Sequence, residues 1–401
     1  MIALPGITIF SEIYESTHSR VYRGRRNCDR QAIILKVLKE DYPTPAELTR
    51  YKQEYKIASS LNLEGVIKAY SLEKFQNTLV IIFEDFWGDS LSLLMESQIL
   101  TVLEFLSIAI KTTASLGRIH SANIIHKDIN PSNIVFHPDT GQLSIIDFGI
   151  STILPREKTA VKNPNVLEGT LAYISPEQTG RMNRSLDYRT DFYSLGATFY
   201  ELLARRLPFE TDDAIELVHC HIAKQPLPPA RLNPEIPKAV SDIVMKLLAK
   251  TAEERYQSAW GIQADLEECF HQLQTTGTIE PFPLARFDSS DKFQIPQKLY
   301  GRQREIDTLL AAFDRVSGAA DAEAQDLTAN SPQAKIHNLK SKVELMLVSG
   351  YSGIGKSSLV QEIYKPITKQ RGYFISGKFD QLQRNIPYSA VVTAFAGLVR
   401  H

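Results

Sequence analysis

The chain has 401 residues, of which 43% are hydrophobic, so it is long enough for two or three domains with cores of their own. Its net charge is −1, and we expect no nucleic-acid partner and no binding to membranes through bulk charge. Cys28, Cys220 and Cys269 are scattered singly, which fits a reducing compartment. The sequence has no apolar run near the roughly 18 residues of a membrane span and no signal-peptide pattern, so we expect a cytoplasmic protein.

The first part of the chain predicts a small β-rich lobe over residues 1–86. Residues 7–38 alternate apolar and polar side chains between turns, which is typical of an antiparallel meander. Thr44 and Pro45 then precede apolar residues at helical intervals, so we expect a helix with Thr44 as N-cap and Pro45 in its first turn. Residues 77–91 predict a further strand that runs into a short connection.

The next part predicts a larger helical lobe over residues 87–273. Residues 101–121 have the length and apolar period of a core helix. An apolar helix begins near Asp191, where a lone carboxylate is costly to bury unless it is hydrogen-bonded. Further helices are predicted over residues 239–250 and 261–273.

Residues 119–149 hold the polar side chains on which the functional interpretation rests. Two short apolar runs flank a turn at residues 138–141, which predicts a β-hairpin. Such a hairpin holds its two flanking loops side by side, so Asp128 and Asn133 can face Asp147 across a nucleotide-sized gap. Asn133 and Asp147 would offer oxygen ligands to Mg²⁺, and Asp128 would accept a hydroxyl proton. We therefore predict a phosphoryl-transfer site.

This spacing resembles the catalytic loop and metal loop of protein kinases, which read His-Arg-Asp, an Asn five residues after that Asp, and later Asp-Phe-Gly. The matching residues here are His126, Lys127, Asp128, Asn133, Asp147, Phe148 and Gly149. Either tripeptide alone would also fit a polar turn beside a core strand, whereas both in order favour the kinase fold. The resemblance implies a bilobal α+β fold, with a small, mainly antiparallel lobe and a large helical lobe, that uses ATP and Mg²⁺.

The same resemblance places the nucleotide between the two lobes. Lys36 stands where kinases have the lysine that pairs with the α- and β-phosphates; read alone, it would be a surface lysine at a strand end. Glu54 stands where they have its ion-pair partner, with Glu47 as the alternative. The backbone of Glu84 and Phe86 would hydrogen-bond the adenine edge. The further positions that would enclose the nucleotide are Ser16, Ser19, Val21, Ile34, Phe83 and Val135.

The loop before Val21 departs from the kinase pattern. Its three glycine positions fall on Tyr14, Ser16 and Ser19. Glycine matters there because backbone N–H groups must approach phosphates closely. Serine hydroxyls can partly replace that cradle, and Ile34 stands where many kinases carry a small alanine over the adenine. We therefore expect a tighter or shifted nucleotide pocket.

Residues 150–176 stand where kinases carry the activation segment. The end of this region contains a Gly-Thr pair and then Ser-Pro-Glu, which resemble two anchors of serine/threonine kinases. The resemblance implies that Thr170 bonds Asp128 and frames the acceptor hydroxyl, although a plain loop threonine is the alternative. It also implies that Glu177 pairs with Arg255, and that the carboxylate at the start of the apolar helix accepts backbone hydrogen bonds from the catalytic loop.

A second unit is predicted after a linker. Residues 274–297 are rich in Pro, Thr, Ser and Asp and indicate an interdomain linker, and residues 298–401 begin with an arginine-bearing turn and a short helix. Residues 343–350 predict a buried strand, followed by a glycine-rich turn and a helix, which is the context of a P-loop. Lys356 would reach the β- and γ-phosphates, and Ser357 would hold Mg²⁺. The residues assigned to this site are Gly350, Gly353, Gly355, Lys356, Ser357 and Ser358.

No strand ending in Asp follows residues 371–379, so we expect the second half of a nucleotide-hydrolysing domain to be absent. The order of parts, with the phrases KEDYPTPAELTRY and SGKFDQLQRNIPYSA, resembles the N-terminal part of large bacterial, notably cyanobacterial, signalling proteins. In these a serine/threonine kinase domain precedes a predicted AAA-type ATPase, then GAF and histidine-kinase modules. The resemblance covers essentially the whole chain and implies a fragment of such a sensor.

Three functions stay open. The first is an active serine/threonine kinase with Asp128 as base and a protein substrate. The second is a pseudokinase that senses nucleotide or docks partners, and the third is a P-loop nucleotide switch with the kinase lobe as an appendage. The glycine-free loop favours the second function, as does Asn130, which stands where serine/threonine kinases usually have a lysine on the γ-phosphate. Retention of every carboxylate that handles protons and metal favours the first.

Overall fold

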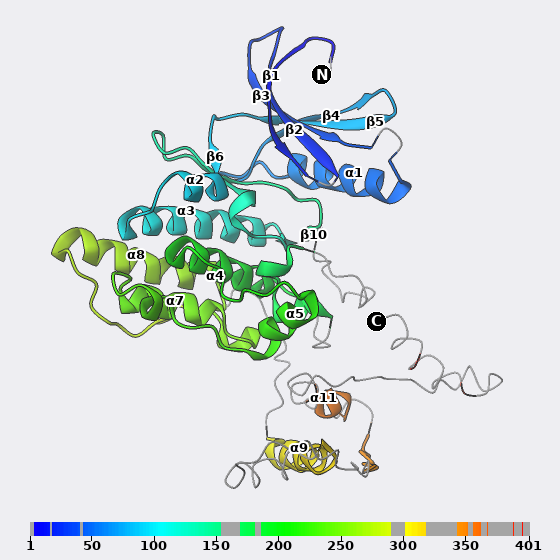
Figure 1. Cartoon of the computed structure of the whole chain (residues 1–401), viewed down its shortest axis with the longest axis vertical. Coiled ribbons are helices and arrows are strands. Elements are labelled where there is room, and N and C mark those ends of the chain that lie inside the picture. The colour runs from blue at the N-terminus through cyan, green and yellow to red at the C-terminus, as the bar shows by residue number, and fades with distance from the viewer. Residues whose placement is uncertain are drawn as a thin grey trace, which may run out of the picture. The chain divides into compact units, whose positions relative to one another are not determined.

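The computed structural model describes residues 4–16, 18–40, 43–153, 169–180, 186–289, 301–317, 343–351 and 356–361, and the single positions 367, 388 and 395. They divide into a first unit, Met1–Gly180 with Ser185–Phe293, and a second unit made chiefly of Gln294–His401. The first unit has two lobes, a β-rich lobe in blue and a helical lobe in cyan to green (Figure 1).

The small lobe is a five-stranded antiparallel sheet with one helix packed against it (Figure 1). The strand order is β1-β2-β3-β5-β4, with every neighbouring pair antiparallel. The elements are β1 Ile7–Glu15, β2 Ser19–Arg26, β3 Ala32–Leu38, α1 Pro45–Ser60, β4 Ala69–Phe75 and β5 Thr78–Glu84. The predicted meander and helix are both present.

Alternation along β3 decides which side chains face the large lobe. Ile33 and Leu35 are fully buried in a separate apolar cluster of the sheet, whereas Ile34 packs on the main core together with residues of α1. Because successive side chains of a strand point to opposite faces, Lys36 shares the face of Ile34. The sequence period of two therefore turns Lys36 toward α1.

The N-terminus of α1 forms a capping box, as its sequence predicts. Glu47 N donates to Thr44 Oγ1 over 3.3 Å, and Thr44 N donates to Glu47 Oε2 over 2.8 Å. Pro45 occupies the first turn, where no hydrogen bond is lost. These contacts fix the residue at which α1 begins. They therefore also fix the positions of its later side chains, such as Glu54, relative to the sheet.

The large lobe is built from helices around one apolar core. Its helices are α2 Leu91–Ser97, α3 Val102–Ser121, α4 Arg189–Ala204, α5 Ala214–Ala223, α6 Pro229–Leu232, α7 Lys238–Leu247 and α8 Ala259–Thr276. Its short strands are β6 Asp89–Ser90, β7 Ile124–Ile125, β8 Ile134–Phe136, β9 Leu143–Ile145 and β10 Thr152–Ile153. Strands β8 and β9 form the predicted hairpin, with Val135 opposite Ser144. Phe105 of α3 meets Phe199 of α4 edge to face, with ring centroids 5.4 Å apart.

Helix α8 continues past the predicted end of the lobe near Leu273, to Thr276, and the chain then turns back onto the lobe. We call residues 277–289 the strap. Phe282 and Leu284 of the strap pack against the core. Asp288 accepts hydrogen bonds from Gln257 N (2.7 Å) and Ser258 Oγ (2.8 Å) at the start of α8. The polar residues that indicate a linker thus include Asp288, which accepts hydrogen bonds at the N-terminus of α8.

The second unit is described only in part. Helix α9, Gln303–Ser317, is the short helix expected after the arginine-bearing turn, and α11, Lys356–Gln361, follows the glycine-rich turn. Residues 343–350 are described without a strand, and Val343 and Leu347 are almost fully exposed, so the predicted buried strand is wrong. A parallel strand needs paired and covered neighbours, and the described residues of this unit contain none.

Candidate active site

The catalytic loop between β7 and β8 is held in place by hydrogen bonds to a buried carboxylate. Asp191, at the start of α4, accepts hydrogen bonds from His126 N (2.8 Å) and Lys127 N (2.7 Å). His120 Nε2 lies 2.8 Å from the same carboxylate. A fully buried carboxylate is stable only with such partners. The predicted contact between Asp191 and the loop is confirmed.

Asp128 is held at both carboxylate oxygens. Thr170 donates to Oδ1 from its hydroxyl (2.8 Å) and from its backbone N (2.9 Å). Asn133 Nδ2 donates to Oδ2 over 3.0 Å and to the Asp128 carbonyl over 2.9 Å. The predicted contact of Thr170 with Asp128 is therefore present. The carboxylate can move little, which is what a positioned proton acceptor requires.

Asn130 braces this loop. Its Oδ1 accepts a hydrogen bond from Ser132 N (3.0 Å), and its Nδ2 donates to the Asp128 carbonyl (3.1 Å). The same nitrogen lies 3.4 Å from Thr170 Oγ1. Both ends of the amide are thus used inside the loop. A direct catalytic role for Asn130 stays a prediction.

Lys36 stands between two carboxylates at the junction of the lobes. Its Nζ lies 2.7 Å from Glu54 Oε1 and 3.1 Å from Asp147 Oδ2. Glu54 is therefore the partner, and the alternative, Glu47, belongs to the capping box of α1. Burial disfavours the charged lysine, but the charges of Asp147 and Glu54 outweigh it and raise the pKa of Lys36.

The two carboxylates around Lys36 differ in their pKa. Burial raises the pKa of Glu54 to about 7, and the attraction of Lys36 offsets only part of that rise. Burial also acts on Asp147, but there Lys36 outweighs it and the net pKa is lowered. Asp147 is therefore ionised at neutral pH, as a metal ligand must be.

The metal loop is turned so that its acid faces Lys36. Asp147 has a φ of 65°, and its Oδ1 accepts a hydrogen bond from Gly149 N over 3.1 Å. Phe148 is fully buried, with its ring centroid 5.0 Å from that of His126. Because Asn133 gives its amide nitrogen to Asp128, its amide oxygen is the atom left for a metal. An ionised carboxylate and an amide oxygen fit a hard divalent cation.

No group of three or more His, Cys, Asp and Glu side chains arranged for a metal ion occurs among the described residues. Among the described residues, Asp147 and Asn133 are the two side chains that we assign to a cation at this site. Magnesium commonly keeps waters and phosphate oxygens as its other ligands. The donor set thus suits a metal that arrives with a nucleotide.

The positions predicted to enclose the nucleotide converge between the lobes. Val21 lies opposite Lys36 in the β2–β3 register, and Ile34 lies opposite Phe83 in the β3–β5 register. Val135 of β8 lies beside the connection between the lobes: a Cβ added to the glycine after Trp87 would lie 2.7 Å from Val135 Cγ1. Glu84 ends β5, and Phe86 lies two residues beyond it. That these positions enclose a nucleotide stays a prediction.

The two serines of the β1–β2 turn are used within the turn. Ser16 Oγ accepts hydrogen bonds from Ser19 N (2.9 Å) and His18 N (3.2 Å). It also lies 3.1 Å from the Ser19 carbonyl and 3.0 Å from Ser19 Oγ. These bonds close the turn with side chains where kinases use glycine. A phosphate-binding role for Ser16 and Ser19 stays a prediction.

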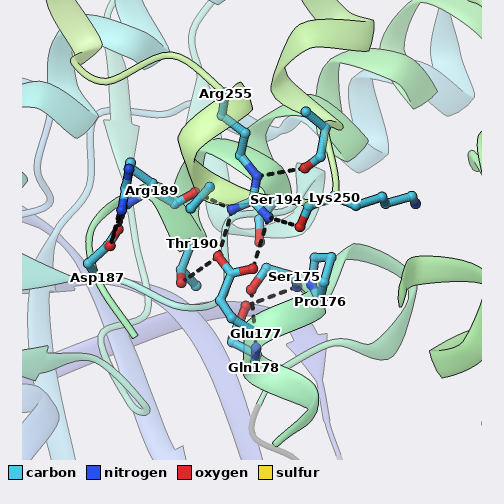
Figure 2. A network of polar contacts seen from close by, with 12 residues as sticks. Ser175, Pro176, Glu177, Gln178, Asp187, Arg189, Thr190, Ser194, Lys250 and Arg255 are labelled. Atoms are coloured by element: carbon cyan, nitrogen blue, oxygen red, sulfur yellow. Dashed lines mark hydrogen bonds and ion pairs between the residues drawn. The ribbon is translucent and has the colours of Figure 1, made fainter. Parts of the chain in front are cut away.

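The activation segment is anchored by the predicted ion pair (Figure 2). Arg255 donates from Nη1 to Glu177 Oε1 (2.6 Å) and from Nη2 to Oε2 (2.8 Å), a two-bond pairing inside the lobe. Thr190 Oγ1 donates to the same carboxylate over 3.0 Å. Burial acts against ionisation, yet Arg255 outweighs it and lowers the pKa of Glu177. The pair is confirmed.

Sequence reasoning missed Gln178, which joins this anchor to the catalytic loop. Its Nε2 donates to the Lys127 carbonyl over 2.8 Å, and its Oε1 accepts from Ser175 N over 3.1 Å. A signal was available, because Ser175-Pro-Glu-Gln178 has the Ser-x-x-Gln pattern of a capping box. Gln178 therefore adds a second tie, beside that of Thr170, between the end of the activation segment and the catalytic loop.

The P-loop assignment is described at only a few of its residues. Lys356 Nζ donates to the carbonyls of Gly350 (2.8 Å) and Tyr351 (2.7 Å). Gly353 and Gly355 lie outside the described residues. The same holds for the side chains of the two residues after the lysine, Ser357 and Ser358. Their roles stay predictions.

A family model of the protein kinase domain matches residues 8–268, and a model of the AAA ATPase domain matches residues 333–401. The chain therefore belongs to the protein kinase family. None of the helices in the described ranges is both long and apolar enough to cross a membrane.

Similar proteins carry kinase names. Hybrid signal transduction histidine kinase G of Dictyostelium discoideum is 32% identical over 74% of this chain and 10% of that protein. Serine/threonine-protein kinase PrkC of Bacillus subtilis is 30% identical over 59% of this chain and 36% of that protein. For PknB of Mycobacterium leprae the identity is 29%, over 64% of this chain and 40% of the relative. The chain spans from about a tenth to two fifths of these relatives.

Proposed function

We propose that this chain is a serine/threonine protein kinase that transfers the γ-phosphoryl group of Mg-ATP to hydroxyl groups of protein substrates. The observation that carries the proposal is the fixed carboxylate of Asp128, whose two oxygens accept bonds from Thr170 and Asn133. The membership of the protein kinase family and the serine/threonine kinases among its relatives support it.

Each side chain has one task in this reaction. Asp128 accepts the proton of the substrate hydroxyl. The hydroxyl oxygen forms a bond to the γ-phosphorus while the bond between the γ-phosphorus and the β–γ bridging oxygen breaks, which releases ADP. Lys36 orients the phosphates, and Glu54 orients Lys36. Asp147 and Asn133 would hold Mg²⁺, which neutralises charge on the phosphates when bound.

A pseudokinase is the second candidate, and two observations favour it. The Ser16 hydroxyl is used inside its own turn, and the Asn130 amide is used inside the catalytic loop. Two contacts that kinases usually offer to phosphates are thus replaced by contacts within the protein. Nucleotide would then bind through the remaining groups and act as a signal.

The wider context is also proposed. The kinase domain would be the first part of a bacterial, cyanobacterial-type sensor protein in the cytoplasm, followed by the nucleotide-binding P-loop module over residues 298–401 and then GAF and histidine-kinase modules. The match of an AAA ATPase domain to residues 333–401 supports the module. A histidine kinase among the relatives, of which this chain matches 10%, supports the longer context.

A radiolabelled-ATP transfer assay on the full chain with a generic serine/threonine substrate tests the proposal. We expect label on serine or threonine in the substrate, dependent on Mg²⁺ and absent with Asp128→Asn. Nucleotide binding without any transfer by the wild type would favour the pseudokinase. Transfer that is equal in the wild type and Asp128→Asn would place the catalysis elsewhere.

A further inference from the structure

The connection between the lobes is folded in one tight conformation. We call residues 85–88 the hinge segment; it lies between β5 and β6. Trp87 has a φ of 62°, unusual for a bulky residue, and its N donates to Asp85 Oδ1 over 2.8 Å. A Cβ on Gly88 would lie 2.6 Å from the Phe86 ring. A side chain at this position would have to displace the Phe86 ring and Val135, so glycine suits the close packing of the segment.

One side chain of the small lobe holds both ends of this segment. Arg23 on β2 places Nε 2.8 Å from Asp85 Oδ2, and its Nη2 donates to the Gly88 carbonyl over 3.2 Å. The guanidinium also lies over the Trp87 ring, 5.0 Å from its centroid. The Asp85 side chain is only 3% exposed and that of Arg23 18%, so the pair is largely shielded from water. We call these contacts the Arg23 clamp.

The Arg23 clamp borders the nucleotide pocket. In the sheet register Arg23 lies opposite Ile34, which in turn lies opposite Phe83, so the three share one row on one face. Val21 and Lys36 form the next row of that face. This is the face on which Lys36 meets the metal loop. The guanidinium therefore stands on the sheet face that carries Lys36, and it contacts the hinge segment at Asp85 and Gly88.

We propose that Arg23 is a positioning residue for the nucleotide, which fixes the backbone groups of Glu84 and Phe86 on either side of Asp85 so that they meet the adenine edge. The inference rests on the nucleotide site proposed above. If the hinge segment already has its bound conformation, nucleotide binding loses less conformational entropy. It would offset the weak phosphate cradle of a loop that has serines where kinases have glycines.

The test compares Arg23→Ala with Arg25→Ala in the full chain. Arg25 lies two residues along the same strand and is exposed, with its guanidinium near Phe10. Adenosine is the first probe, because it has no phosphates for the P-loop or Lys36. We expect Arg23→Ala to weaken adenosine and Mg-ATP binding by about tenfold each, the scale of one lost hydrogen bond. Arg25→Ala should change neither.

A kinetic readout separates positioning from general damage. Arg23→Ala should raise KM for ATP by a similar factor while kcat and KM for the protein substrate stay within about twofold. Arg23→Lys, which keeps the charge but loses the planar fork, should restore part of the affinity. If Arg23→Ala does not fold, Asp85→Asn replaces it, since the amide oxygen still accepts from Trp87 N while the ion pair is lost.

Three results would overturn the inference. Adenosine affinity that is equal in Arg23→Ala and Arg25→Ala would show that the Arg23 clamp does not act on the hinge. A lower kcat together with KM values for ATP and for the protein substrate that are raised by a similar factor, and a lower Tm, would give Arg23 a purely structural role. A wild type that binds neither adenosine nor Mg-ATP at the kinase site would overturn the proposed nucleotide site as well, whereas the first two results leave that site standing.

Discussion

Two loops of the kinase site carry the same family pattern to very different degrees. In the catalytic loop, Asp128 and Asn133 stand at their expected places, and the Asp128 carboxylate accepts hydrogen bonds from Asn133 and from Thr170. In the β1–β2 loop every glycine is replaced, and Ser16 closes the turn through its own hydroxyl. The first loop works through side chains of fixed identity, whereas the second works through backbone amides that other residues can also present. The chemical step can therefore persist where the phosphate cradle has changed.

The largest expected effect concerns the catalytic loop. Asp128→Asn should lower phosphoryl transfer by about 10²–10⁴-fold, because it removes the proton acceptor but keeps the shape of the loop. Nucleotide affinity should stay close to that of the wild type. Single-turnover transfer and calorimetric binding measure the two quantities. A variant as active as the wild type would contradict the assignment of Asp128 as the base.

The second largest effect is expected for the stability of Arg255→Ala, because this variant leaves the Glu177 carboxylate buried without its cation. Breaking such a pair costs about 3–5 kcal/mol in the free energy of unfolding. Chemical denaturation would measure the loss, and Lys238→Ala on the exposed pair with Asp242 is the matched control, expected to change less than about 1 kcal/mol. Equal effects of the two variants would contradict the anchoring role.

The same pair predicts a pH dependence. The folded-state pKa of Glu177 is lowered from its ordinary 4.5, so its stabilising contribution is present above that value and is lost as the pH falls through the folded pKa. Glu177→Gln has no carboxylate to protonate. The stability difference between wild type and Glu177→Gln should therefore shrink below about pH 4.5. A difference that is constant down to pH 3 would argue against the lowered pKa.

Asp147→Ala should remove the Mg²⁺ dependence of nucleotide binding at the kinase site, with a loss of about tenfold or more in Mg-ATP affinity. Alanine has no oxygen that could bind a metal ion or pair with Lys36, as the Asp147 carboxylate does. Titration of a fluorescent ATP analogue with and without Mg²⁺ checks this outcome. A wild type indifferent to Mg²⁺ would support a metal-independent pseudokinase instead.

The altered loop predicts a smaller effect. Restoring glycines with Ser16→Gly and Ser19→Gly should raise Mg-ATP affinity by about two- to fivefold, since it frees backbone amides to approach the phosphates. Adenosine affinity should not change, because the loop does not reach the base. Weaker Mg-ATP binding in the double variant would mean that the closed turn is itself the phosphate site.

The smallest effect concerns the second unit. Lys356→Ala should leave phosphoryl transfer by the kinase domain within about twofold, because no sequence feature couples the two nucleotide sites. The same transfer assay measures it, with Mg-ATP held well above KM. A larger change would reveal coupling between the kinase lobe and the P-loop module.

The parts of the site that sequence predicted are those with fixed spacing and fixed chemistry. The ion pair of Lys36 with Glu54, the support of the catalytic loop by Asp191 and the bond of Thr170 to Asp128 are all present. Each joins residue types that a single function requires, so their order along the chain identifies them. The alternation of β3 and the capping signals of α1 likewise predicted the small lobe.

What sequence missed depends on contacts without a pattern. The Arg23 clamp joins residues 62 positions apart that are ordinary surface types when read alone. The exposed run at residues 343–350 has the apolar character of a strand, but strand formation depends on partners rather than on the run itself. The Pro, Thr and Asp residues of the strap indicate a linker by composition, but the same residue types are equally typical of turns and caps that pack on a domain.

The strap has a practical consequence for where the kinase can be cut. The family match stops at residue 268, inside α8, and a shortened protein ending there would lose Phe282 and Leu284 from the core. It would also lose Asp288, for which the lobe leaves room at Gly261, where a Cβ would lie 2.4 Å from the carboxylate. A kinase domain expressed by itself should therefore include Asp288, and instability of a protein cut before it would report on the missing strap rather than on the catalytic residues.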